Sequence, residues 1–163
     1  MSGPGPTGEL SRLAADAVAA LKSRGLTVAT AEATTGGLIG HLLTSVPGSS
    51  AVFRGGVAPY SNAMKRAIGV PPEVLSEFGA VSREAAQALA AAVRTWADAD
   101  IGVAETGMAG PTGRMPGLFW IGVTGPGSGF VAQRFSFNTD RLGNQRACAR
   151  AALQTLIETL AEG

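Results

Sequence analysis

Apolar residues recur at helical spacing near both ends of the chain and once in its middle. The first pattern predicts an amphipathic helix that starts after about Thr7 and stops before Gly25. The last predicts a helix over about 144–161, and the middle one a long helix that follows Ser82, a good N-cap residue. In the middle helix, Ala85, Leu89, Ala92, Val93 and Trp96 are expected to share one face. Shorter helices are predicted at 38–43, around 64–68, and between Pro71 and Gly79.

Five short apolar segments between these helices predict strands: 26–31, 51–58, 101–104, 118–124 and 131–137. The first and third are brief, apolar segments, which suits strands buried on both faces of a sheet. The last two are joined by a glycine-rich linker at 125–129 and are predicted to be antiparallel. Helices between short buried strands, followed by one hairpin, predict a three-layer α/β/α sandwich around a mixed, mostly parallel sheet of about five strands.

Length and charge narrow the class of protein. With 163 residues the chain has the length of one ordinary domain, so we expect a single domain over 1–163 with a loose tail at 1–6. A net charge of +1 leaves no basic field for nucleic acid, so no nucleic-acid partner is predicted. The longest apolar run, 117–123, is far shorter than the roughly 20 residues of a membrane helix. No membrane partner is expected, and the start of the chain does not resemble a secretion signal, so the predicted location is cytoplasmic.

The scarcity of cysteine and histidine argues against metal and disulfide chemistry. Cys148 is the one cysteine and His41 the one histidine, so a single copy cannot assemble a zinc site from these residues. His41 falls within an apolar helix and is interpreted as a structural or surface residue rather than a base. The sequence predicts neither a bound metal nor a cofactor.

Two segments rich in hydroxyl groups and glycine follow predicted strands, at 31–37 and 105–111. Ligands of open α/β sheets bind outside the carboxyl ends of the strands, where both segments should lie. In 31–37, free amide groups and the positive end of a helix dipole would attract a phosphate. The segment has neither the Walker nor the dinucleotide-binding pattern. Tight packing with Thr34 or Thr35 as a helix cap is therefore an equally good interpretation from this segment alone.

A series of motifs runs in order along nearly the whole chain, at 30–37, 46–51, 56–57, 60–62, 65, 69–70, 79–82, 106–107, 109–111 and 140–141. Together these resemble the C-terminal domain of the CinA competence/damage-inducible proteins, whose stand-alone members include nicotinamide mononucleotide (NMN) deamidases. The resemblance implies hydrolysis of the NMN carboxamide to nicotinic acid mononucleotide and ammonia, by a serine that a lysine activates. It also implies the small independent form of the family and a homo-oligomer.

By this resemblance, Lys65 matches the family's lysine, whereas the family's serine falls on Ala33, which cannot form an ester. Thr34 could supply a substitute hydroxyl, although neighbouring side chains on an extended segment point to opposite sides. A water activated by Lys65 or by Glu32 is another route. Two functions follow as hypotheses: an NMN amidohydrolase with an altered nucleophile, or a non-catalytic nucleotide-binding paralogue that acts as a sensor or partner subunit. A purely structural oligomerising domain is a third, if side chains fill the glycine loops.

The predicted substrate is a pyridine mononucleotide. Tyr60 is expected to form a wall for the pyridine ring, with Asn62 and Thr106 as polar partners, and Arg141 is the preferred phosphate ligand because its forked donors match an anion. Core packing is the alternative role of Tyr60, and solvent-exposed helix positions are the alternatives for Arg141 and Lys65. The full predicted binding set is Thr35, Gly36, Gly37, Tyr60, Asn62, Thr106, Gly107, Gly110 and Arg141.

Three further departures from the family pattern fall near this site. Glu105 places a carboxylate beside the predicted anion site, where the family usually has a neutral residue. The stretch 112–116 is shorter than its family counterpart and should trim one wall of the pocket. The family's second arginine falls at Gln145, with Arg146 next to it, and a shift of one position rotates a helical side chain by about 100°. Whether Arg146 replaces that arginine is left open by the sequence.

Overall fold

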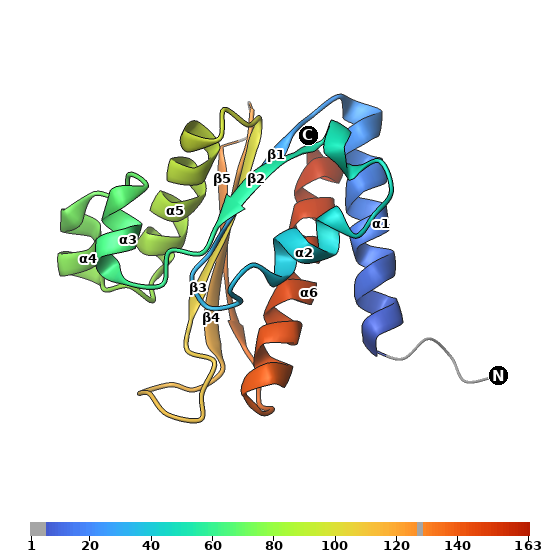
Figure 1. Ribbon diagram of the computed structural model, residues 1–163. Coiled ribbons are helices and arrows are strands. Elements are labelled where there is room, and N and C mark those ends of the chain that lie inside the picture. The colour runs from blue at the N-terminus through green and yellow to red at the C-terminus, as the bar shows by residue number, and fades with distance from the viewer. Residues whose placement is uncertain (1–5, 127–128) are drawn as a thin grey trace.

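The computed structural model describes residues 6–126 and 129–163, which form a five-stranded sheet and the helices around it (Figure 1). The strands lie in the order β2 (Phe53–Val57), β1 (Val28–Glu32), β3 (Ile101–Gly107), β4 (Leu118–Thr124) and β5 (Phe130–Ser136). β1 pairs in parallel with β2 and β3, whereas the β3–β4 and β4–β5 pairs are antiparallel. Four of the five strands therefore run in one direction, and the predicted mixed sheet is confirmed.

Helices cover both faces of this sheet (Figure 1). On one face lie α1 (Pro6–Arg24), α2 (Leu38–Thr44) and α6 (Arg141–Glu162), and on the other α3 (Asn62–Ala67), α4 (Pro72–Phe78) and α5 (Arg83–Trp96). A short 3-10 turn, η1 (Ser49–Ala51), links α2 to β2. This is the three-layer α/β/α sandwich expected from the alternation of helical and apolar segments. Among the described residues, no helix is long and apolar enough to cross a membrane.

Alternation along the strands divides the core into two layers. Val28 packs with the α1 and α6 residues, whereas its neighbour Ala29 packs with α5 residues such as Leu89. α5 packs very closely on the sheet at Gly102, which has no side chain. A Cβ at this position would collide with the carbonyl oxygen of Ala90. This close approach packs the middle of α5 against the amino end of β3, and the Thr106 hydroxyl, which donates to the Ala80 carbonyl oxygen, fixes the loop before α5 at the carboxyl end.

Several boundaries differ from those predicted. β3 continues to Gly107, so Glu105 and Thr106 lie in a strand and not in the expected loop. α6 begins at Arg141, where the Asp140 carboxylate accepts a hydrogen bond from the Gly143 amide at 2.7 Å. Trp96 is 57% exposed, although it shares its face of α5 with the fully buried Leu89.

Other expectations are met where the structure tests them. Ser82 caps α5 by accepting a hydrogen bond from the Ala85 amide at 3.0 Å. His41 is exposed on α2, as a surface residue would be. Most of the tail predicted at 1–6 lies outside the described residues, and α1 already begins at Pro6. The linker predicted at 125–129 likewise includes residues 127 and 128, which are not described.

Candidate functional site

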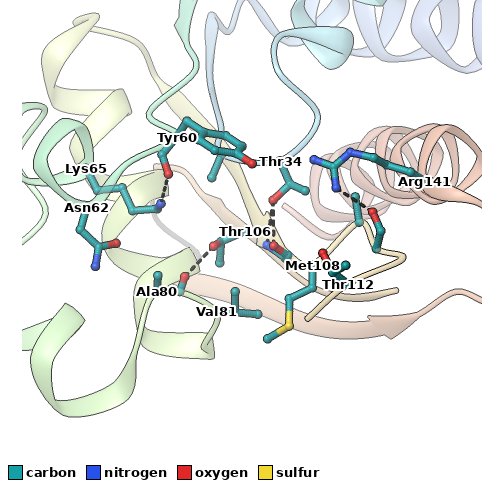
Figure 2. Close-up of a pocket in the computed structure, with 14 residues that line it drawn as sticks. Thr34, Tyr60, Asn62, Lys65, Ala80, Val81, Thr106, Met108, Thr112 and Arg141 are labelled. Carbon is teal, nitrogen blue, oxygen red and sulfur yellow. Dashed lines mark hydrogen bonds between the residues drawn. The ribbon is translucent and has the colours of Figure 1, made fainter. Parts of the chain in front are cut away.

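A pocket of about 310 Å³ opens at the carboxyl ends of β1 and β3 (Figure 2). The loop before α3, the loop before α5 and the first turn of α6 complete its walls. The lining residues are Ala33, Thr34, Tyr60, Asn62, Lys65, Ala80, Val81, Thr106, Gly107, Met108, Ala109, Gly110, Thr112 and Arg141. The pocket therefore lies at the edge of the sheet where ligands were expected. It brings together Thr34, Tyr60, Asn62, Lys65, Thr106, Gly107, Gly110 and Arg141 from the predicted set.

Lys65 is a buried lysine in the wall of this pocket. It lies on α3, which Ser61 caps by accepting the Met64 amide at 3.1 Å, and its side chain is only 4% exposed. The Lys65 Nζ donates to the Tyr60 carbonyl oxygen at 2.9 Å (Figure 2). Burial lowers the pKa of Lys65, while the negative charge of Glu105 partly opposes this shift. The alternative of an exposed helix lysine is therefore wrong, and the amine is suited to accept a proton.

Thr34 lines the same pocket, but its hydroxyl group already has two partners. The Thr34 Oγ1 donates to the Gly107 carbonyl oxygen at 3.1 Å and accepts from the Gly107 amide at 3.0 Å. A nucleophilic hydroxyl must instead give its proton to a base. The Thr34 hydroxyl therefore links the end of β1 to the end of β3. Its role as a substitute nucleophile stays a prediction.

Two buried carboxylates occupy the amide groups of the turn between β1 and α2. The Glu105 Oε1 accepts from the Thr34 and Thr35 amides at 2.6 and 2.8 Å. Glu32 accepts from the Ile39 and Gly40 amides at 2.6 and 3.0 Å. These carboxylates take four of the amide donors that a phosphate in this turn could use, which favours the packing interpretation of the segment. The binding roles of Gly36 and Gly37 stay predictions.

The same contacts explain where the remaining predicted residues lie. Thr35 is 7% exposed and turns its hydroxyl toward Glu32 and Glu105, so it does not line the pocket. Glu32, Gly36 and Gly37 face a separate hollow beside β2. The two glycines have φ of 66° and 107°, which the tight turn requires. Glu32 is thus a cap for α2, and Lys65 remains the candidate base.

Glu105 is fully buried, and its environment favours the protonated carboxyl group. Burial raises the pKa of Glu105 against the opposing effect of the Thr35 and Thr34 amides, and the charge of Glu32 raises it further. In the part of the chain that the structure describes, the Glu105 Oε2 has no hydrogen-bond partner. Thr35 Oγ1 lies 2.8 Å from Glu32 Oε1 and 3.0 Å from Glu105 Oε1. Because a hydroxyl group has one proton, Thr35 can donate a hydrogen bond to only one of these two carboxyl groups at a time.

Side chains at the start of α6 hold the loop after β1 and the loop after β3 in place by donating to three main-chain carbonyl groups. Arg141 donates to Gly110 at 2.7 Å, and Asn144 to Ala109 at 2.8 Å. Gln145 donates to Thr34 at 2.9 Å. The sequence reading missed the structural roles of Asn144 and Gln145, although polar residues at one end of an otherwise apolar helix are a usable signal. Arg146 lies in a different surface hollow, and so it does not replace the family's second arginine in this pocket.

Tyr60 is 71% exposed at the mouth of the pocket, so core packing is not its role. Asn62 lies on the Lys65 side of the pocket, and Thr106 donates its hydroxyl proton to the Ala80 carbonyl at 2.5 Å (Figure 2). Within the described ranges, no group of three histidine, cysteine, aspartate or glutamate side chains could hold a metal ion. The pocket thus combines a buried lysine amine, an arginine guanidinium, one exposed aromatic ring and several main-chain groups.

Comparison with known proteins places this site in a family. The model of the CinA C-terminal domain matches residues 10–160. The chain belongs to this family. Its relatives include a CinA-like protein from Chloroherpeton thalassium, which is 45% identical over an alignment of 148 residues that covers 86% of this chain and 35% of the relative. A putative competence-damage inducible protein from Halothermothrix orenii is 41% identical over 145 residues, with the same two coverages.

Solved structures of the CinA family share the fold over almost their entire length. The competence/damage inducible protein CihA from Agrobacterium tumefaciens has a TM-score of 0.89 at 36% identity, covering 97% of this chain and 98% of that one. A CinA superfamily protein from Klebsiella pneumoniae has a TM-score of 0.91 at 31% identity, covering 94% and 99%. The chain spans only about a third of the length of the curated relatives named above.

Proposed function

We propose that this CinA-family chain binds a pyridine mononucleotide such as NMN in the pocket and hydrolyses its carboxamide with a water molecule that Lys65 activates. One observation carries the proposal: a buried lysine amine and an arginine guanidinium enter the same pocket from opposite sides (Figure 2). Such a pair suits a small ligand with a reactive group at one end and an anionic group at the other.

The binding part of the proposal rests on Arg141 and Tyr60. Among the described residues, Arg141 gives one N–H to the Gly110 carbonyl, which fixes the guanidinium and leaves further donors for a phosphate. The exposed ring of Tyr60 offers a face for a planar pyridine. A volume of about 310 Å³ is at the small end of the range for ligand sites. A mononucleotide, with its ribose near the mouth, suits these dimensions.

The chemical part rests on Lys65 and on the methyl group at position 33. Ala33 lines the pocket. The position that a serine hydroxyl would occupy there is available to a water molecule. A neutral Lys65 amine takes a proton from this water as its oxygen attacks the carboxamide carbon. The ammonium then returns the proton to the amide nitrogen, which leaves as ammonia. Without a covalent ester the reaction is expected to be slow.

A titration of the purified protein with NMN, followed by an assay for released ammonia, tests both parts. We expect saturable binding, weaker binding of nicotinamide riboside because it lacks the phosphate, and ammonia release that Lys65→Ala removes. Failure to bind NMN at millimolar concentration would refute the proposal as a whole.

A second function is favoured by the engaged hydroxyl of Thr34 and the missing hydroxyl at position 33. In that case the protein binds the mononucleotide without turnover and acts as a sensor or as a subunit of a larger assembly. Saturable NMN binding with no ammonia above the buffer level would select this function and contradict the hydrolytic part.

Arg141→Gln is expected to weaken NMN binding by about 10- to 100-fold, because a hydrogen bond to a charged group contributes about 1.5–3 kcal/mol. Arg146→Gln is the matched control, since Arg146 lies on the same helix but outside the pocket. Equal dissociation constants for the two variants, measured by calorimetry, would show that Arg141 does not bind the phosphate.

A further inference from the structure

We propose that Lys65 is also a covalent site, which forms an imine with small anionic aldehydes that enter the pocket. This reactivity goes beyond the proposed hydrolysis and does not depend on it, because it needs only the amine and access to it. The structure offers three independent lines of support: the surroundings of the amine, the other hydroxyl groups in the pocket, and the groups opposite.

The surroundings of Lys65 favour a free amine over a paired ammonium. Its side chain is 4% exposed, and its Nζ donates to one acceptor, the Tyr60 carbonyl oxygen. The ion pair found in the described part of the chain joins Arg150 to Glu9, and no carboxylate lies within ion-pair distance of Lys65. A buried ammonium ion without a counter-charge is costly, whereas a neutral amine keeps its lone pair for reaction. Lysines in such surroundings form imines in other enzymes.

A neutral amine is a stronger nucleophile than the hydroxyl groups that also line the pocket, those of Thr34, Tyr60, Thr106 and Thr112. Position 33 carries a methyl group, and the hydroxyl groups of Thr34 and Thr106 already donate to the carbonyl oxygens of Gly107 and Ala80. Cys148, the one thiol of the chain, is fully buried in the core and burial raises its pKa well above the usual range. An electrophile in this pocket therefore meets the Lys65 amine first.

The opposite side of the pocket indicates which aldehydes fit. Arg141 provides a fixed guanidinium, and the Tyr60 ring lies between Lys65 and Arg141 in the close-up (Figure 2). A planar ring that carries the aldehyde on one side and a phosphate on the other meets all three groups. The ligand class is therefore a phosphorylated aromatic aldehyde.

The reaction balances without a further reactant. The lone pair of the neutral Lys65 Nζ attacks the aldehyde carbon, and the carbonyl oxygen takes up a proton to give a carbinolamine. Loss of that hydroxyl group as water, with a proton from the nitrogen, leaves the carbon–nitrogen double bond. The products are the imine and one water molecule, and no oxidant or reductant is consumed.

The chain carries its own control, because it has two lysines and the other, Lys22, is exposed on α1. The experiment incubates the full chain with substoichiometric pyridoxal 5′-phosphate, reduces the imines with borohydride, and assigns the labelled peptides by mass spectrometry. We expect label on Lys65 to exceed label on Lys22 by about tenfold or more, since a positioned group reacts with a high effective concentration. The excess should shrink for pyridoxal, which lacks the phosphate, and for Arg141→Gln.

The pH dependence separates a pocket amine from a merely accessible one. Because its pKa is lowered, Lys65 should keep its labelling at pH values where an ordinary lysine amine is protonated and unreactive. Lys65→Arg should abolish the main label, and Lys22→Arg should leave it unchanged. Equal labelling of the two lysines, or the same pH profile for both, would overturn the inference.

Competition by NMN distinguishes this inference from the proposed function. Protection of Lys65 by NMN supports both. Preferential labelling that NMN does not reduce would leave the covalent site standing and count against the mononucleotide pocket. Binding of NMN together with no preferential labelling of Lys65 would support the mononucleotide pocket and overturn the covalent site.

Discussion

Ala33→Ser is expected to raise ammonia release from NMN by about two orders of magnitude or more. Removing the serine nucleophile of a serine protease costs about a million-fold, and restoring one here should recover part of such a factor. Ala33 lines the pocket with 5% exposure, and one added oxygen atom is a small change in volume. Lys65, on the same pocket, is available as the base that takes the hydroxyl proton. Steady-state ammonia release measures the gain.

Two companion variants show whether the new activity uses the intended pair. Ala33→Gly also changes residue 33 but adds no oxygen, so it should not raise the rate. Lys65→Ala combined with Ala33→Ser should lose the gain, and the acyl-enzyme ester should be detectable by mass spectrometry only when both groups are present. An Ala33→Ser protein that binds NMN but hydrolyses it no faster than the unaltered chain would show that the pocket lacks the donors for an oxyanion.

Glu105→Leu is expected to lower the free energy of unfolding by about 2–5 kcal/mol. The change removes the acceptor of the Thr34 and Thr35 amides, and each buried amide left without a partner costs about 1–3 kcal/mol. Glu105→Gln is the matched control, because its carbonyl oxygen can still accept both amides, and its effect should be much smaller. Chemical denaturation measures both values, and equal losses for the two variants would contradict the capping role of this carboxylate.

The same pair of proteins tests the protonation of Glu105. Its pKa is raised in the folded state, so the folded chain binds this proton more tightly than the unfolded chain does. Stability from this group is complete at pH values below the ordinary pKa of a glutamate, and is lost as the pH rises toward the raised pKa. Glu105→Gln should remove this fall in stability with rising pH. A decline of the same size in both proteins would assign it to other groups.

Much of the fold could be predicted from the pattern of apolar residues. Helical periodicity and short buried segments are local signals, and they gave the helices, the five strands and the layer order. Trp96 has the helical spacing of the buried Leu89, yet it is 57% exposed and lines a surface hollow beside the segment that joins α3 to α4. Periodicity predicts the direction in which a helical side chain points, but not whether another element covers that side chain.

The site residues were predicted largely through the family resemblance, and the prediction failed where long-range contacts decide. Tyr60, Lys65, Thr106 and Arg141 come together as expected. Glu105 is different, because pairing of β1 with β3 places it in register with Glu32 and under the amides of Thr34 and Thr35. No local pattern shows that a carboxylate 70 residues away occupies those donors. For this reason our proposal places the phosphate on Arg141, already the preferred ligand from the sequence, and not on the glycine turn.

A crystal structure of the protein soaked with NMN tests the central claim most directly. We expect the carboxamide beside Lys65 and Ala33, the pyridine ring against Tyr60, and the phosphate on the Arg141 guanidinium. NMN bound with its phosphate on the glycine turn at Gly36 and Gly37, or a pocket that stays empty at saturating NMN, would contradict it.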